Sequence, residues 1–136
     1  MTAAGGAEVL PIAGDDDVVR VRQVVRGYAQ RVKLSLVDQT KLVTATSELA
    51  RNTLIYGGGG TARVEVVDDG RRQGVRASFE DEGPGIPDLA LALADGWSSG
   101  TGMGLGLSGS RRLVDEFDLD TEVGRGTTVT VVKWKR

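Results

Sequence analysis

Residues 47–60 read SELARNTLIYGGGG and join the end of a helical pattern to a run of four glycines. Apolar side chains recur at three- and four-residue spacing from Leu42 to Thr53, which is typical of an amphipathic helix. Ser35 to Asp38 resembles a capping box at the start of this helix. The helix is expected to continue to about Tyr56 and to end at Gly57, because glycine tolerates the conformation that commonly closes a helix.

The pattern on both sides of this segment predicts a single α+β domain over residues 1–136, with about residues 1–7 flexible. The order β-α-α-β-β-(α)-α-β-β predicts a two-layer sandwich, in which helices cover one face of a mixed, mostly antiparallel sheet. The other expected elements are an edge strand at Glu8 to Ile12, a helix over about 17–32, a hairpin of strands around 62–66 and 75–79, a short helix from Asp88 to Asp95, a helix from about Leu107 to Phe117, and strands at Leu119 to Val123 and Thr127 to Trp134.

Composition narrows the chemistry that this chain can perform. The chain has 136 residues, 26% of them charged, and a formal net charge of −2, so no strong field favours nucleic acid or an anionic membrane as a partner. It contains no cysteine and no histidine, which excludes disulfides, thiolate sites and histidine-based catalysis. A general base must therefore be a carboxylate or, less often, Lys or Tyr. The chain shows no membrane span or signal peptide, so a cytoplasmic location is expected.

Glycine is unusually frequent, at 20 residues, and it is concentrated in two places. One is the run from Gly57 to Gly60, and the other lies between Gly83 and Gly109, where apolar residues are interleaved with the glycines. Glycines in such positions allow positive φ and close approach of the backbone to another group. A loop-rich small domain would explain them, but two concentrations around a helical segment favour a backbone that wraps a ligand.

Glu48 and Asn52 lie four residues apart on the predicted second helix and so share one face of it. Surface helices often carry such polar pairs without any further role. Their stripe also contains Ala45 and Leu49, which places the pair at a core margin. A carboxylate beside an amide oxygen there could orient a hydroxyl and help to hold a hard cation such as Mg²⁺.

A second polar segment, residues 81–88, reads DEGPGIPD and directly follows a predicted strand. Alternation along the strand delivers Asp81 to its end, where Gly83 and Gly85 let the backbone turn sharply beside a flat ligand. A carboxylate is an acceptor only, which suits an exocyclic amino group such as that of adenine. A plain Gly-Pro turn without a ligand is the simpler alternative.

A third segment, residues 100–107, reads GTGMGLGL and opens a predicted helix. Bare glycine amides that lead into a helix N-terminus suit a di- or triphosphate. Gly104, Gly106 and Gly109 also match the spacing of dinucleotide-binding sites, but no strand precedes them and no βαβ unit follows, so we reject that interpretation. The P-loop pattern is absent as well.

Taken in order, these segments carry a family resemblance. They resemble the N, G1, G2 and terminal Gly-Thr boxes of the GHKL (Bergerat) ATP-binding superfamily, which joins gyrase, heat-shock chaperone, MutL and histidine-kinase ATPase domains. The absence of a histidine in the N box separates the chain from histidine kinases. More narrowly, SELARNTLIYGGGG, DEGPGIPD, GLGLSGSRRLVDEF and GTTVTVVKW are similar to the switch serine/threonine kinases of the stressosome. The matching boxes are Glu48-x-x-Arg51-Asn52, Asp81-x-Gly83-x-Gly85, Gly102-x-Gly104-x-Gly106 and Gly126-Thr127.

The resemblance implies a role for each matching residue, with ATP and Mg²⁺ as cofactors. Asn52 would ligate Mg²⁺ through its side-chain oxygen, and Glu48 would be the base that orients or deprotonates the acceptor hydroxyl. Asp81 would accept a hydrogen from the adenine amino group, assisted by Gly85 and by Thr127 through water. The other residues implied at the nucleotide are Gly83, Gly100, Gly102, Met103, Gly104, Leu105 and Gly106, with Trp97 to Thr101 as a short mobile lid.

The resemblance also implies partners. Kinases of this group phosphorylate Ser or Thr on STAS-domain scaffold and antagonist proteins and, once released, activate a PP2C-type phosphatase. No nucleic-acid or membrane partner is expected. Two alternatives remain open at this point. The chain could be an anti-sigma factor kinase of the same superfamily, or a nucleotide-gated binding module with negligible turnover, although a pure binder needs no base beside the metal ligand.

Overall fold

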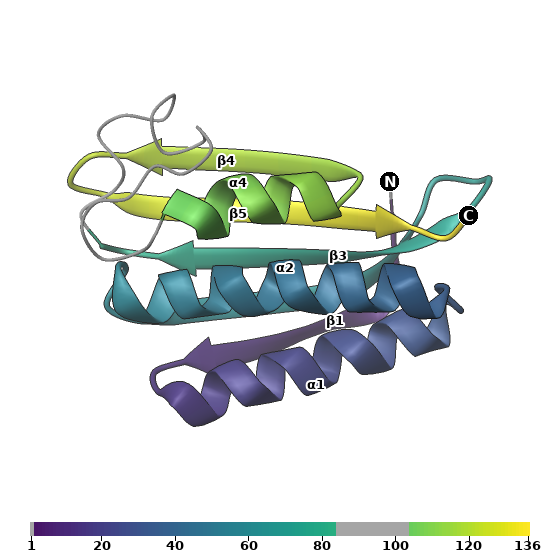
Figure 1. Ribbon diagram of the computed structural model, residues 1–136, viewed down its shortest axis with the longest axis horizontal. Helices are drawn as coiled ribbons and strands as arrows, with labels where there is room; N and C mark the ends of the chain where they lie inside the picture. Colours follow the sequence, from purple (N-terminus) through teal and green to yellow (C-terminus); the bar gives the residue numbers. More distant parts are fainter. Residues whose placement is uncertain (1, 84–103) are drawn as a thin grey trace.

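The computed structural model describes residues 2–83 and 104–136, and it confirms the α+β sandwich (Figure 1). The expected short helix at Asp88 to Asp95 lies outside the described residues. The elements run in the order β1 (Thr2–Ile12), α1 (Asp15–Arg31), α2 (Leu36–Ile55), β2 (Gly60–Asp68), β3 (Gln73–Asp81), α4 (Gly104–Leu113), β4 (Glu116–Glu122) and β5 (Gly126–Trp134).

The sheet has five strands in the order β1-β2-β3-β5-β4. Each of the four ladders between the described strands is antiparallel, so this part of the sheet is uniform rather than mixed. Helices α1, α2 and α4 lie on the same face of the sheet, with α2 in the middle (Figure 1). Helix α2 lies along the direction of the central strands and reaches from one end of the inner face to the other, with α1 and α4 packed against it (Figure 1).

Strand β1, helix α4 and strand β4 differ most from their predicted bounds. Strand β1 begins at Thr2, six residues before the expected strand, because Thr2 and Ala3 also pair with β2. Helix α4 ends at Leu113 rather than near Phe117, and Phe117 lies in β4. The Asp115 N–H already donates to the Val132 carbonyl at 2.9 Å, so the chain has joined the sheet there. Phe117 and Leu119 both pack against the core, with the two-residue period of a strand. The prediction of a helix arose because Phe117 also follows Leu113 and Val114 at helical spacing.

The core lies between the helix layer and the inner face of the sheet. Alternate residues of β2, β3 and β5 point toward α1 and α2, which gives each strand its apolar inner stripe. Fully burying one such aliphatic or aromatic side chain stabilises the fold by roughly 1.5–3 kcal/mol. The largest side chains in this cluster with almost no exposure are Phe79, Ile12, Leu42, Leu49, Leu107, Val21, Val25, Val64 and Val75.

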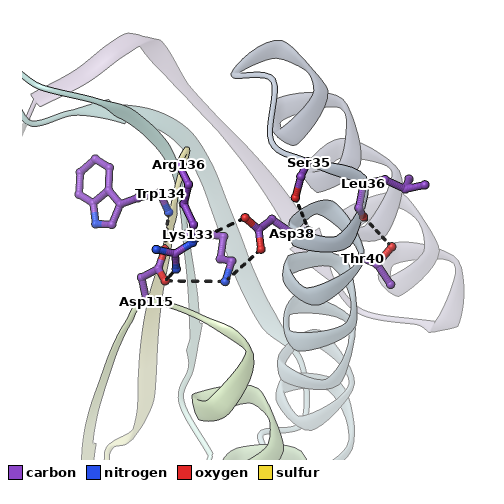
Figure 2. Close-up of polar contacts among 8 residues, drawn as sticks. All are labelled: Ser35, Leu36, Asp38, Thr40, Asp115, Lys133, Trp134 and Arg136. Atoms are coloured by element: carbon purple, nitrogen blue, oxygen red, sulfur yellow. Dashed lines mark hydrogen bonds and ion pairs between the residues drawn. The ribbon is translucent and has the colours of Figure 1, made fainter.

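A network of four charged side chains closes the end of the sandwich where α2 begins (Figure 2). The Lys133 side chain extends from β5 and is only 5% exposed; its Nζ lies 3.6 Å from an Asp38 oxygen and 3.7 Å from an Asp115 oxygen. Arg136 contacts both carboxylates as well. Asp38 lies in the first turn of α2, where its backbone N–H donates to the Ser35 cap at 3.1 Å, as the sequence predicted. Two cations therefore balance two carboxylates.

Candidate functional site

A row of polar and small residues crosses the inner face of the sheet at the other end. The register pairs Gly60 with Asp81, Asp81 with Thr127, and Thr127 with Thr121. Phe79 and Val129, which lie two residues from Asp81 and Thr127 on the same strands, belong to the buried inner face, so the polar residues point to this face as well. We call Gly60, Asp81, Thr127 and Thr121 the polar row. It replaces the apolar core at the end of the sheet where α2 ends.

Asp81 is the last residue of β3, as alternation predicted. Its carboxylate is half-buried and accepts a hydrogen bond from the Gly83 N–H at 2.9 Å and another from the Thr127 N–H. Burial raises the pKa of Asp81, and these two backbone hydrogen bonds offset the rise only in part. The result is a fixed, partly desolvated acceptor at the end of the central strand.

The backbone around Asp81 is packed so closely that glycine is needed beside it. A Cβ on Gly57 would overlap the Asp81 side chain, and a Cβ on Gly126, whose φ is +117°, would overlap the Asp81 carbonyl. A Cβ on Gly83 would lie 2.7 Å from the Gly57 Cα. A hollow of about 480 Å³ lies beside these residues and is lined by residues 57–61 and 80–82. The first glycine concentration therefore brings backbone, not side chains, to the carboxylate.

Glu48 and Asn52 lie on the last turns of α2, above this end of the sheet. Asn52 is half-buried, and its Nδ2 is the single buried side-chain nitrogen or oxygen in the described part of the chain without a hydrogen-bond partner. Glu48 is exposed, not held at the core margin where its helical stripe had placed it. An unpartnered buried amide costs about 1–3 kcal/mol, which suits a side chain whose partners arrive with a ligand.

Helix α4 opens with the last part of the third glycine segment. It begins at Gly104, three residues earlier than predicted, so Gly104, Leu105 and Gly106 form its first turn. The first N–H groups of a helix have no intrahelical acceptor and suit a phosphate group. The Ser110 hydroxyl donates to the Ala45 carbonyl of α2 at 3.3 Å, which ties α4 beside the helix of Glu48 and Asn52.

Four predicted site residues, Gly85, Gly100, Gly102 and Met103, and the lid at Trp97 to Thr101 lie outside the described residues.

These donors and acceptors fit a magnesium nucleotide. The carboxylate of Asp81 suits an amino group on a base, and the N-terminus of α4 suits phosphates. Mg²⁺ typically takes one or two protein oxygens and completes its shell with phosphate oxygens and water. An amide oxygen such as that of Asn52 is a ligand of this type, and the half-buried Asn52 lies near the end of α2.

Comparison with known proteins agrees with this geometry. The family model of the histidine kinase-, DNA gyrase B- and HSP90-like ATPases matches residues 37–136. The chain is 43% identical over 120 residues to the serine/threonine-protein kinase RsbT of Bacillus subtilis, and the match covers 88% of this chain and 90% of that protein. It is also 27% identical over 120 residues to the anti-sigma F factor of Geobacillus kaustophilus, covering 82% of this chain and 80% of that protein.

Solved structures show the same fold. The crystal structure of the RsbU and RsbW domains of Rv1364c from Mycobacterium tuberculosis aligns with a TM-score of 0.67 at 22% identity, over 96% of this chain and 33% of that one. The mycobacterial sensor histidine kinase MprB aligns with a TM-score of 0.56 at 22% identity, over 96% and 99% of the two chains. The chain belongs to the histidine kinase-, gyrase B- and HSP90-like (GHKL) ATPase family.

Within that family it is an RsbT-like serine/threonine-protein kinase, and it therefore binds ATP. No helix in the described ranges is long and apolar enough to cross a membrane.

One residue of the polar row was not predicted from the sequence. Thr121 lies on β4 directly opposite Thr127, and the two hydroxyl oxygens are 2.8 Å apart. The turn between the last two strands is formed by residues 123–125, so Glu122 pairs with Gly126 and Thr121 with Thr127. The predicted turn at Gly124-Arg125-Gly126 would have paired Thr121 with Val129 instead, so the sequence pattern contained no correct signal for this pair.

Proposed function

We propose that this kinase transfers a phosphoryl group from Mg²⁺-ATP to Ser or Thr of STAS-domain scaffold and antagonist proteins. When released from them, it activates a PP2C-type phosphatase in a stress-signalling pathway. The observation that carries the proposal is the arrangement at one end of the sandwich. There the fold brings together a carboxylate, a buried amide nitrogen on α2 with no partner among the described residues, and the glycine-rich start of α4, which come from separate parts of the chain.

Each residue has a separate task in this proposal. Asp81 accepts from the adenine amino group, and Thr127 assists it through water. Asn52 holds Mg²⁺, whose charge would offset that of the phosphates when it is bound. Phosphoryl transfer depends mainly on positioning and charge neutralisation, so the chain needs no histidine.

The surroundings of Glu48 support its role as the base. It is exposed and lies one helical turn from Asn52, so its carboxylate can face the hydroxyl of another protein. A base buried under the nucleotide could not reach an acceptor on a folded partner. The acceptor hydroxyl would donate its proton to Glu48 as its oxygen attacks the γ-phosphorus of ATP, while the bond from that phosphorus to the β,γ-bridging oxygen breaks and ADP leaves.

The choice of partner rests on similarity. Identity to the switch kinase is 43%, against 27% to the anti-sigma F factor, which favours the STAS-directed kinase over a sigma-binding one. The net charge of −2 gives no support to nucleic acid or a membrane as the partner. We place the kinase in the cytoplasm, where ATP and such partners meet.

Phosphotransfer to a purified STAS-domain partner tests the proposal. The wild type should place one phosphate on a Ser or Thr of the partner with ATP and Mg²⁺, as mapped by mass spectrometry. Glu48→Gln should lower that rate by ~10²–10⁴ while ATP affinity stays within a few-fold, because a general base acts on the chemical step alone. Glu8→Gln, at an exposed glutamate on β1, is the matched control.

Two outcomes would contradict the proposal. A parental rate in Glu48→Gln would remove Glu48 from the chemistry. A wild type that binds ATP and changes its partner affinity, but transfers no phosphate, would favour the nucleotide-gated binding module instead.

A further inference from the structure

Thr121 and Thr127 form a hydroxyl pair at the edge of the polar row. Their Oγ1 atoms are 2.8 Å apart, and the Thr121 hydroxyl also lies 3.2 Å from the Gly126 carbonyl oxygen, in position to donate to it. Thr121 belongs to β4, the outermost strand on this side, and Thr127 to β5. Both side chains are half-buried on the inner face.

The number of hydrogens limits how this pair can bond. Each hydroxyl has one hydrogen to donate and two lone pairs. If Thr121 donates to the Gly126 carbonyl, its hydroxyl can only accept from Thr127. The hydrogen of Thr127 is then directed at Thr121, and the two lone pairs of the Thr127 oxygen are left as acceptors. Thr127 presents these acceptors next to Asp81, its register partner on β3.

We propose that Thr121 is a positioning residue that sets the nucleotide-base specificity of the kinase by fixing the Thr127 hydroxyl as an acceptor. Asp81 and Thr127 then form two adjacent acceptors. Such a pair favours the amino group that adenine carries at its six-membered ring, directly or through water. It disfavours the carbonyl oxygen that guanine carries at the same position. The inference rests on the proposed placement of adenine at Asp81.

Affinities for ATP and GTP, measured side by side by calorimetry, test this role. Thr121→Val keeps the shape of the side chain and removes the hydroxyl, so Thr127 becomes free to rotate and donate. We expect the ratio of ATP to GTP affinity to fall about three- to tenfold, because a site loses discrimination when a fixed polar group is released. Thr121→Ser restores the hydroxyl and should restore the ratio. Thr121→Ala repeats the measurement without a branched side chain in case the valine variant does not fold.

Thr130→Val is the matched control. Thr130 lies on the same strand as Thr127, and its hydroxyl lies 3.1 Å from that of Ser78, but it belongs to the alternate, outer set of β5 side chains. This variant also loses a hydroxyl pair between neighbouring strands, and the ratio of affinities should not change. A purely structural effect of Thr121→Val would weaken ATP and GTP binding by the same factor, which would overturn the proposal.

The other outcomes separate this inference from the function on which it rests. An unchanged ratio in Thr121→Val, in a protein that loses ATP binding on Asp81→Asn, would overturn the role of Thr121 and leave the nucleotide site standing. A wild type without measurable ATP affinity would overturn both. A lowered ratio that Thr121→Ser restores supports the proposal.

Discussion

The two ends of the inner face are both polar, yet they are built in opposite ways. Where α2 begins, Lys133 and Arg136 meet Asp38 and Asp115, and every charge has an opposite charge within 4 Å (Figure 2). Where α2 ends, Asp81 receives only backbone N–H groups, and the Asn52 amide nitrogen has no partner in the described chain. Between the two ends the face is apolar.

The difference separates polar residues that hold the fold from polar residues available to a ligand. A buried charge that is already paired within the protein contributes structure, and removing its partner is costly. A buried acceptor or amide whose partners are incomplete lowers the stability of the fold, unless a bound molecule completes it. Asp81 and Asn52 belong to the second kind.

Removing Lys133 should give the largest effect on stability. Lys133→Met leaves Asp38 and Asp115 with Arg136 alone, and breaking a buried pair in this way typically costs about 3 kcal/mol of unfolding free energy. Chemical denaturation measures the loss. Lys135→Met, at an exposed lysine two residues further along, is the control and should change little. ATP affinity of the folded Lys133→Met protein should equal that of the wild type; a loss of both together would mean that the two ends are not independent.

Removing the Asn52 amide should weaken ATP binding and leave the stability of the fold almost unchanged, the reverse of Lys133→Met. Asn52→Ala should weaken ATP binding about tenfold with Mg²⁺ present, and much less without it, because one good metal or hydrogen-bond contact is worth about 1–2 kcal/mol. Its unfolding free energy should change by less than about 1 kcal/mol, since the amide nitrogen has no hydrogen-bond partner among residues 2–83 and 104–136. Equal losses of affinity with and without Mg²⁺ would show that Asn52 has a structural role instead.

Acidification should weaken ATP binding through protonation of Asp81, by a smaller factor than Asn52→Ala does. The pKa of Asp81 is raised by burial, so its carboxylate is protonated at a higher pH than an ordinary aspartate. ATP affinity should therefore fall a few-fold as the pH is lowered, and the fall should begin at a higher pH than the ordinary aspartate pKa of roughly 3.9 would give. Asp81→Asn, titrated alongside, isolates this change from protonation of ATP itself. Identical pH profiles for the two proteins would rule out Asp81 as the titrating group.

Stability should depend on pH in opposite directions at two carboxylates. Because the pKa of Asp81 is higher in the folded than in the unfolded chain, its contribution is most favourable in acid and is lost as the pH rises through that pKa. Glu65 on the outer face is desolvated by burial, but hydrogen bonds and charge from Arg63 and Arg76 outweigh this and lower its pKa. Its contribution is present above its unfolded pKa and is lost as the pH falls through the lowered value.

The sequence predicted more of the polar residues where α2 ends than of those where α2 begins. Glu48, Asn52 and Asp81 were predicted because helical spacing and strand alternation place them on one face or at one end. The network of Lys133 was not predicted, because Lys133 and Asp38 lie 95 residues apart in the chain and only the fold brings β5 and the start of α2 together. Thr121 was missed because the predicted turn shifts the pairing of the last two strands by two residues. Phe117 was assigned to a helix because it follows Leu113 and Val114 at helical spacing.

Calorimetric titration of ATP into the wild type and Asp81→Asn is the most direct test of the nucleotide site. Asp81→Asn keeps the size of the side chain and replaces an acceptor with a donor where the adenine amino group is expected. The wild type should bind ATP, and Asp81→Asn should bind at least about tenfold more weakly while remaining folded, since a buried unpaired donor costs about 1–3 kcal/mol. Equal affinity of the two proteins would contradict the assignment of the polar row as the adenine site.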